Sequence, residues 1–193
     1  GIILAFWIIS NILLTTIQQL IVKNKEVTQE NIPKYSIGMI VAHLGVALLI
    51  LGITGSSIWQ KEKIIRMKVN DETSIHNYNI VFKGISEITG PNYVALQGNF
   101  WVYNNKKNII TKLKPENRFY PVTNNSTTEA SIHTNLARDL YIVLGNGDIN
   151  EGWIVRIYYN PLVIWIWIGA FAIFLGGLFS MKNNFKKLKR LSI

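Results

Sequence analysis

The sequence predicts a membrane protein built from α-helices, with an antiparallel β domain inserted between two of them. Of its 193 residues, 49% are hydrophobic. Two apolar runs, residues 37–53 and 162–179, are each close to the ~20 residues that cross ~30 Å of hydrocarbon. The stretch between them alternates short β-branched and aromatic runs with turn residues. We therefore expect two clear transmembrane helices, a third weaker candidate, and an extramembrane small barrel or sandwich.

The weaker candidate opens the chain at residues 1–22. It is mostly apolar but carries Asn11 and several Ser, Thr and Gln residues, so it spans a bilayer only if its polar face meets protein. It lacks the basic start and the small-residue cleavage site of a signal peptide. Since the sequence starts with Gly1 rather than Met, we expect a truncated or processed chain that begins within or just before a helix.

Basic residues orient these helices. Lys and Arg cluster in residues 23–35 and 182–193, which the positive-inside rule places on the cytoplasmic or matrix side. The β domain then lies on the periplasmic or intermembrane-space side. The predicted order is a transmembrane helix at 1–22, a basic loop at 23–35, a transmembrane helix at 36–56, the β domain at 57–160, a transmembrane helix at 161–181 and a basic tail at 182–193.

The β domain is predicted from runs typical of strands. The predicted strands are residues 64–69, 78–82, 95–103, 109–113, 140–144 and 153–159. Turn residues separate them at 90–92, 104–105, 124–126 and 145–148. Roughly six to eight strands at this spacing favour an antiparallel sandwich or small barrel over βαβ units.

Composition excludes several classes of function. The formal net charge is +9, but much of the excess lies in the predicted loop and tail next to lipid headgroups, and no recognition motif supports nucleic-acid binding. The chain has no Cys, which excludes a zinc-thiolate site, a Cys nucleophile and covalent c-type haem attachment to this chain.

His43 is the principal candidate functional residue, because it stands inside an otherwise apolar span. An ionisable group there costs on the order of a few kcal/mol and marks a functional site by default. Neutral imidazole is a common ligand of metals and haem iron. Alternatively, His43 hydrogen-bonds to a neighbouring helix and only fixes packing. The residues around it leave both interpretations open.

Small residues form a stripe on each clear span. Gly38, Ala42, Gly45 and Gly52 share one helical face, so another backbone or a flat ring can approach beside His43. The last span has a similar stripe at Gly169, Ala172, Gly176 and Ser180. Both patterns predict partner helices.

The β domain shows no recognisable catalytic dyad or triad. Its scattered charged residues, which we interpret as structural ion pairs, include Arg118, Glu129, Arg138, Asp139 and Arg156. We expect His76 and His133 to be exposed. Trp153, Trp165 and Trp167 are expected to be interfacial anchors where the domain returns to the membrane.

Motifs spread over residues 36–180 resemble the C-terminal part of CcmF, the cytochrome c haem lyase family of the multi-subunit system I maturation pathway. The matching residues occur in the family's order. They include Gly38, Met39, Ala42, His43, Gly45, Gly52, Gly90, Pro91, Asn92, Tyr93, Gly98, Phe100, Pro115, Glu116, Arg118, Tyr120, Thr128, Glu129, Asp139, Leu140, Tyr141, Trp153, Arg156, Tyr158, Pro161, Trp165, Trp167 and Gly169.

The resemblance implies that His43 is one axial ligand of a transmembrane haem b. In this family the haem is thought to help keep the incoming haem iron reduced while its vinyl groups are joined to the two thiols of an apocytochrome CXXCH motif. The family's tryptophan-rich WWD segment, its flanking histidines and the other transmembrane haem ligand lie upstream of the matched region. The resemblance therefore implies a polypeptide that is not catalytically complete alone.

The implied partners are the WWD-bearing N-terminal part of CcmF, thiol-handling and haem-chaperone subunits, and apocytochrome c. The implied location is the mitochondrial inner membrane or the bacterial cytoplasmic membrane, and both a naturally split C-terminal subunit and a fragment fit the sequence. Two alternatives remain: a haem-free membrane assembly scaffold, and a transporter or ion-path subunit that uses His43 as a proton relay. The relay should come with further intramembrane charged residues, and the two clear spans contain none.

Overall fold

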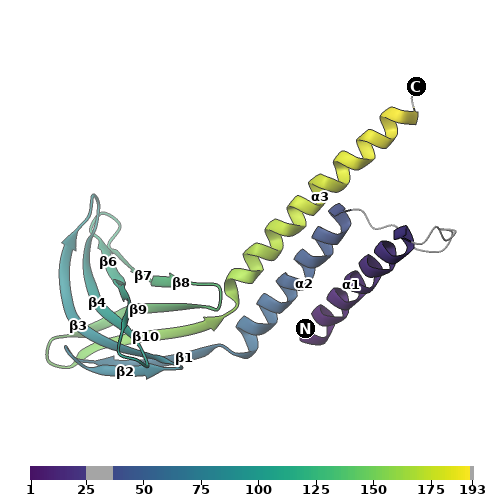
Figure 1. Ribbon diagram of the computed structural model, residues 1–193. Helices are drawn as coiled ribbons and strands as arrows, with labels where there is room; N and C mark the ends of the chain where they lie inside the picture. Colours follow the sequence, from purple (N-terminus) through teal and green to yellow (C-terminus); the bar gives the residue numbers. More distant parts are fainter. Residues whose placement is uncertain (25–36, 192–193) are drawn as a thin grey trace. The chain divides into compact units, whose positions relative to one another are not determined.

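The computed structural model describes residues 1–24 and 37–191, so most of the predicted basic loop lies outside the described residues. The described chain forms two compact units. The helical unit comprises Gly1–Ile58 and Leu162–Ile193, and the β unit comprises Trp59–Pro161. Figure 1 shows the helices of the first and the sheets of the second.

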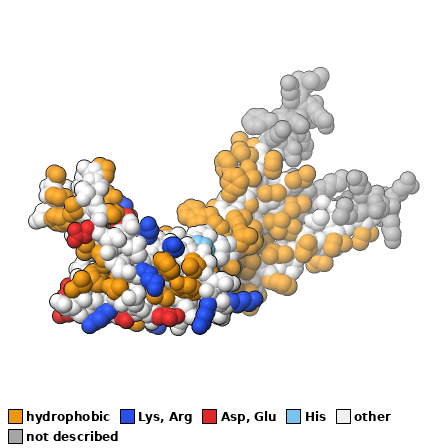
Figure 2. Space-filling model, turned by 60° about the vertical axis from the view of Figure 1, so that its left-hand side comes forward, with side chains coloured by type: hydrophobic (Ala, Val, Ile, Leu, Met, Phe, Trp, Pro, Cys, Tyr) orange, Lys and Arg blue, Asp and Glu red, His pale blue; other side chains and the backbone are white. Residues whose placement is uncertain are grey.

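The helical unit contains α1 (Ile2–Asn24), α2 (Ile37–Ile58) and α3 (Val163–Leu191). Each includes a stretch long and apolar enough to cross a membrane: Ile2–Gln19, Ile37–Ile58 and Val163–Met181. Large apolar side chains on these helices remain exposed, as Figure 2 shows for one face of the molecule. Exposed apolar surface of this extent is what a protein embedded in lipid requires. The chain is a membrane protein.

Helices α2 and α3 pack through their two small-residue stripes. A Cβ atom added to Gly38 would lie 2.6 Å from the carbonyl oxygen of Gly176, and one added to Gly45 would lie 2.7 Å from that of Gly169. Two helix backbones can approach this closely only where the contacting residues are glycines, which have no side chain. Because residue numbers rise along α2 as they fall along α3 at these contacts, the two helices are antiparallel. Each stripe has a partner helix, as predicted, because the stripe of α2 packs against the stripe of α3.

Helix α1 packs against α2. Its buried side chains are Ala5 and Ile12, which lie on the face directed at the unit's interior. Gly1 adjoins Thr54 near the end of α2, whereas Asn11 lies by the start of α2. These two helices are therefore also antiparallel.

The β unit is made of two antiparallel sheets. Sheet A has the order β1–β10–β9–β8. Sheet B has the order β2–β3–β4–β6–β7, with β5 also paired to β4. The strands of sheet A are β1 (Lys61–Met67), β10 (Gly152–Pro161), β9 (Arg138–Asp148) and β8 (Ser131–Thr134). Those of sheet B are β2 (Glu72–Ile75), β3 (Tyr78–Thr89), β4 (Val94–Asn104), β5 (Ile109–Leu113), β6 (Glu116–Tyr120) and β7 (Asn125–Glu129).

The core lies between the sheets and follows the two-residue alternation of each strand. Phe82 on β3 stacks on Phe100 of β4 with ring centroids 4.8 Å apart, and the edge of Trp153 meets Phe82 at 5.8 Å. Sheet A contributes aliphatic side chains opposite these rings, namely Leu140, Ile142, Leu144, Val155 and Ile157. The fold class predicted from the sequence, apolar helices with an inserted antiparallel β domain, is confirmed.

Several predicted details of the β domain are wrong. The described residues form ten strands rather than six to eight, because four short polar strands, β2, β6, β7 and β8, lack a strong apolar pattern. The turn predicted at 145–148 lies inside β9, and the reversal follows it, where the Asp148 carboxylate accepts hydrogen bonds from the backbone N–H groups of Asn150 and Glu151. Trp153 belongs to the core and is not an interfacial anchor.

Candidate functional site

His43 lies on α2, one turn from Met39, and its side chain is exposed on the helix surface. The ring nitrogen Nδ1 is 2.8 Å from the carbonyl oxygen of Met39. A carbonyl can only accept, so Nδ1 carries the proton and donates it. In the neutral ring, Nε2 is then the nitrogen that carries the lone pair. This is the arrangement that fixes the tautomer and orientation of a ligating histidine.

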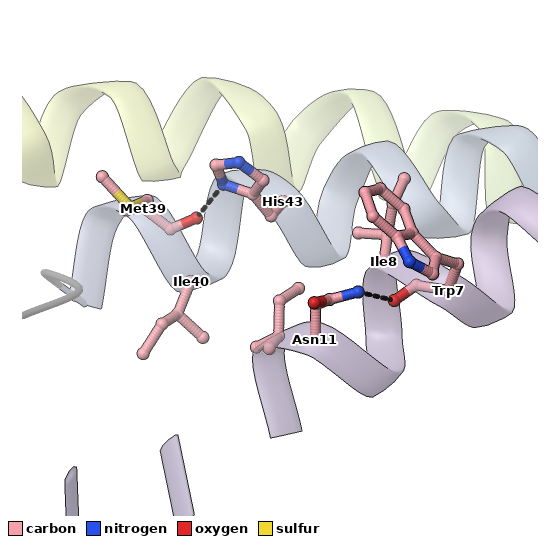
Figure 3. Close-up of a pocket in the computed structure, with 7 residues that line it drawn as sticks. Trp7, Ile8, Asn11, Met39, Ile40 and His43 are labelled. Atoms are coloured by element: carbon pink, nitrogen blue, oxygen red, sulfur yellow. Dashed lines mark hydrogen bonds between the residues drawn. The ribbon is translucent and has the colours of Figure 1, made fainter. Parts of the chain in front are cut away.

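His43 borders a pocket of about 210 Å³ between α1 and α2. Figure 3 shows the residues that line it. They are Trp7, Ile8, Asn11, Ile12, Met39, Ile40 and His43. The amide of Asn11 donates from Nδ2 to the carbonyl oxygen of Trp7 at 2.8 Å, which satisfies part of its polarity within α1. Apart from Asn11 and His43, the lining side chains are apolar or aromatic.

The small-residue stripe of α2 is not part of this pocket. Gly38, Gly45 and Gly52 face α3, whose backbone fills the space beside them. His43 lies on another face of the same helix, toward α1. The close approach that the stripe permits is therefore used by a helix backbone, and a flat ring would have to reach His43 from a different side.

The residues present fit one half of a haem site. A fixed imidazole with a free Nε2 in apolar surroundings suits axial ligation of haem iron. Among the described residues, no cluster of three or more His, Cys, Asp or Glu could hold a metal ion, and the other two histidines belong to the β unit. The pocket is also smaller than the ~300–1,000 Å³ of typical ligand sites. A haem held by His43 would therefore need a second axial ligand and further walls from outside the described residues.

In the β unit, Arg118 forms the ion pairs expected of it. Its Nε is 2.8 Å from Oε2 of Glu116, and its Nη1 is 3.8 Å from Oε1 of Glu129. The guanidinium also lies over the ring of Tyr93, 4.5 Å from its centroid. Burial raises the pKa of Glu116, but hydrogen bonds from Arg118 and Gln97 outweigh it and leave the pKa below its usual value. Arg118 is a structural residue here.

Arg138 differs from the prediction, because it is 1% exposed and forms no ion pair within the described residues. Its Nε donates to the hydroxyl of Tyr78 at 3.0 Å, and Nη1 donates to Nδ1 and the carbonyl oxygen of His133 at 2.8 and 2.7 Å. His133 is consequently half-buried rather than exposed, whereas His76 is exposed as expected. Sequence reasoning missed this buried cation, since a lone Arg in a strand gives no signal of burial.

Burial, together with the positive charge of Arg138, lowers the pKa of His133. Because Arg138 can only donate, Nδ1 of His133 accepts and the neutral ring carries its proton on Nε2. The cluster of Arg138, His133 and Tyr78 therefore holds three strands together, β9, β8 and β3, and so links the two sheets. Of the tryptophans predicted to be interfacial anchors, Trp167, in the first turns of α3, is 69% exposed.

Comparison with known proteins identifies the β unit directly. Residues 58–161 match the family model described as the CcmF C-terminal beta-sandwich. The cytochrome c-type biogenesis protein CcmF of Escherichia coli is 41% identical over 141 residues, covering 73% of this chain and 22% of that protein. The CcmF of Haemophilus influenzae is 40% identical over 144 residues, covering 75% of this chain and 22% of that protein.

A solved structure titled cytochrome c heme lyase CcmF has the same fold. It matches with a TM-score of 0.58 and 20% identity, over 74% of this chain and 24% of that chain. The chain thus spans between a fifth and a quarter of the length of these relatives.

Proposed function

This chain belongs to the CcmF family, and on that premise we propose that it is the C-terminal portion, or a separate C-terminal subunit, of a membrane haem lyase that matures c-type cytochromes. Its helical unit supplies His43 as one axial ligand of a haem b. Its β unit serves for assembly with the WWD-bearing N-terminal part of CcmF and with apocytochrome c.

The observation that supports this proposal best is the state of the His43 ring. Its proton is committed to the carbonyl oxygen of Met39, which leaves Nε2 as a lone-pair donor at the edge of an apolar pocket. Such a nitrogen in a membrane span is costly without an electron-pair acceptor. Haem iron is the acceptor consistent with the family. When bound, the haem would supply one-electron redox chemistry, and the residues of this chain would bind and orient it.

We propose that the rest of the haem site is formed by residues outside this chain. The second axial ligand and the remaining walls of the pocket would come from the N-terminal part of the protein, since this chain spans only 22% of the first relatives. We accordingly propose that the chain is not catalytically complete alone. Thiol-handling and haem-chaperone subunits would complete the system, in the mitochondrial inner membrane or the bacterial cytoplasmic membrane.

The test is a reduced-minus-oxidised absorption spectrum of the complex purified through this chain. Native protein is compared with His43→Gly at matched amounts of folded protein, with His76→Gly as the control. We expect the α band of a b-type haem to disappear only in the His43 variant. Added imidazole, which can occupy the space left by the side chain, should restore the band in part.

An unchanged spectrum in His43→Gly would remove haem ligation from this chain. The haem-free assembly scaffold would then be the better proposal. That alternative needs His43 to bond across to a neighbouring helix, whereas the hydrogen bond described for its ring stays within α2. A proton relay has less support, because the described spans hold no Asp, Glu, Lys or Arg.

A further inference from the structure

The outer face of sheet B carries a cluster of lysines around one tryptophan. Phe100 and Val102 on β4 are buried in the core, so Trp101 between them points to the opposite face. The ammonium nitrogen of Lys112, its cross-strand partner on β5, lies 4.6 Å from the centroid of the Trp101 ring. That of Lys83 on β3 lies 5.4 Å from the same ring. We call the residues Lys83, Trp101, Lys112 and Lys114 the lysine face.

The local structure holds these cations in place. A bulge between Phe82 and Gly84 in β3 turns Lys83 onto the outer face. Lys112 and Lys114 flank a buried leucine, and both line a hollow of about 240 Å³ beside Trp101. An ammonium group over an aromatic ring is attracted to its π-electron face, which restricts the side chains of Lys83 and Lys112. These two lysines therefore lose less conformational entropy on binding than freely rotating surface lysines do.

The positive charge of the lysine face is not compensated by neighbouring acidic residues. Residues 88–115 include four lysines and no Asp or Glu. The ion pairs within the described residues are formed by Arg66 and Arg118, and none includes a lysine. Glu116, the acidic residue that follows Lys114, accepts hydrogen bonds from Arg118 and Gln97 instead. The face therefore presents three neighbouring ammonium groups whose N–H donors can bind carboxylates.

Two kinds of macromolecule carry enough negative charge to bind this face, an anionic membrane surface and an acidic segment of a protein. A tryptophan that anchors a protein in lipid exposes its ring to the headgroup region. Trp101 is half-buried, and its ring is in contact with two lysines. Cations held in fixed positions suit carboxylates fixed on a protein chain better than mobile headgroups. The geometry therefore favours the acidic protein segment.

We propose that the lysine face binds an acidic segment of a partner protein. One Asp or Glu side chain of the segment enters the hollow beside Lys112 and Lys114, and a second binds Lys83 on the other side of Trp101. The role of the ring is to position the ammonium groups. The proposal gives a defined surface to the assembly role proposed above for the β unit, and it rests on that role.

The test is lysine footprinting of the full chain in detergent. The rate at which each lysine is acetylated by an N-hydroxysuccinimide ester is measured by mass spectrometry, with one of two N-acetylated decapeptides present: alternating Glu and Ser, or alternating Gln and Ser. The Glu peptide should slow acetylation of Lys83, Lys112 and Lys114 at least about threefold, as expected for exposed charge pairs. The Gln peptide should have no effect. Lys61 and Lys68, which are exposed lysines of the same unit, are the internal controls.

A variant of Trp101 tests the role of the ring without changing any charge. In Trp101→Leu, protection of Lys83 and Lys112 should fall to the level of the controls. Trp101→Phe keeps an aromatic face and should preserve the protection. Far-ultraviolet circular dichroism of both variants shows whether the β unit is folded, and the comparison of the two peptides on the native chain does not depend on either variant.

Three results would each overturn the proposal: no protection of the three lysines by the Glu peptide, equal protection of Lys61 and Lys68, or unchanged protection in folded Trp101→Leu. Footprinting in phosphatidylglycerol and phosphatidylcholine nanodiscs is the second arm. Protection by phosphatidylglycerol, with none by the peptide, would assign the lysine face to the membrane surface instead. If partner proteins copurify with a chain that shows no peptide footprint, the assembly role stands and only this surface is rejected.

Discussion

The two units of this protein are held together in opposite ways. In the helical unit, the buried positions of α2 are small, namely Gly38, Gly45, Ala47, Gly52 and Gly55, and backbones touch. In the β unit, the buried positions are large side chains such as Phe82, Phe100 and Met67. Water drives large apolar side chains into a core, but lipid gives no such drive, so close backbone contact replaces it. Burial therefore identifies structural residues in one unit and glycine spacing identifies them in the other.

The histidines of the two units differ in how the ring nitrogen Nδ1 is hydrogen-bonded. His43 donates through Nδ1 to its own helix and keeps Nε2 free. His133 accepts through Nδ1 from Arg138 and is tied into the packing of the β unit. The first has a reactive nitrogen directed away from its structural bond, and the second has its lone pair occupied. Exposure of a polar side chain in the apolar unit is what distinguishes a candidate ligand from a structural residue.

The largest expected effect is on the β core. Phe82→Ala removes a ring that is fully buried between Phe100 and Trp153, and should lower the free energy of unfolding by about 3–5 kcal/mol. Phe119→Ala, at a ring that is 38% exposed, should cost much less. Denaturant unfolding of the full chain in mild detergent, followed by near-ultraviolet circular dichroism, measures both. Equal losses would mean that large buried side chains do not dominate this unit.

An intermediate effect is expected in the helical unit. In Gly176→Val the added side chain would meet the backbone of Ala42 and Gly38, so α2 and α3 must separate, at about 1–3 kcal/mol. Gly177→Val on the next residue is the matched control, because a Cβ there meets nothing within 4 Å. Thermal unfolding in detergent, followed by far-ultraviolet circular dichroism, compares the two. If both variants melt together, the stripe does not determine helix packing.

The smallest expected effect is on how the free energy of unfolding depends on pH. The folded state lowers the pKa of His133, so the unfolded chain binds more protons in acid. The stabilisation is complete above the unfolded pKa of about 6.5 and is lost as pH falls from there toward the folded value, by at most about 1.4 kcal/mol per pH unit. His133→Gln, whose amide oxygen can still accept from Arg138, should flatten stability against pH in that range. His76→Gln should leave the slope unchanged, and the opposite result would reject His133 as its source.

The sequence predicted the elements whose pattern reflects burial. The apolar runs of α2 and α3 and the β-branched runs of β4 and β5 are read directly, because lipid or core contacts select those residues. The short strands β6 and β7 were missed, since neither shows a strong apolar pattern: β6 begins with Glu, Asn and Arg, and the edge strand β7 consists of Asn, Ser, Thr and Glu. Gly145 was misread as a turn residue, although it lies within β9 close to the backbone of Ile154.

The candidate site was partly predictable for a similar reason. His43 stands out because a polar residue in an apolar span contrasts with its neighbours. Its hydrogen bond to Met39 follows from the four-residue spacing, but the pocket with Trp7 and Asn11 depends on how α1 packs, which no local pattern encodes. Arg138 was misinterpreted because burial of a charged side chain is decided by distant residues such as Tyr78.

The two sheets of the β unit share an edge, and this affects how the unit folds. Only Ala130 separates β7 from β8, so residues 125–134 form a nearly continuous strand that is the last strand of both sheets. Neither sheet can release its edge without loosening the other, which couples the two halves of the sandwich into one cooperative unit. Amide protons of β7 and β8 should therefore exchange with solvent at a common rate, and the sandwich should form late and in a single step, once this shared strand has found both of its neighbours.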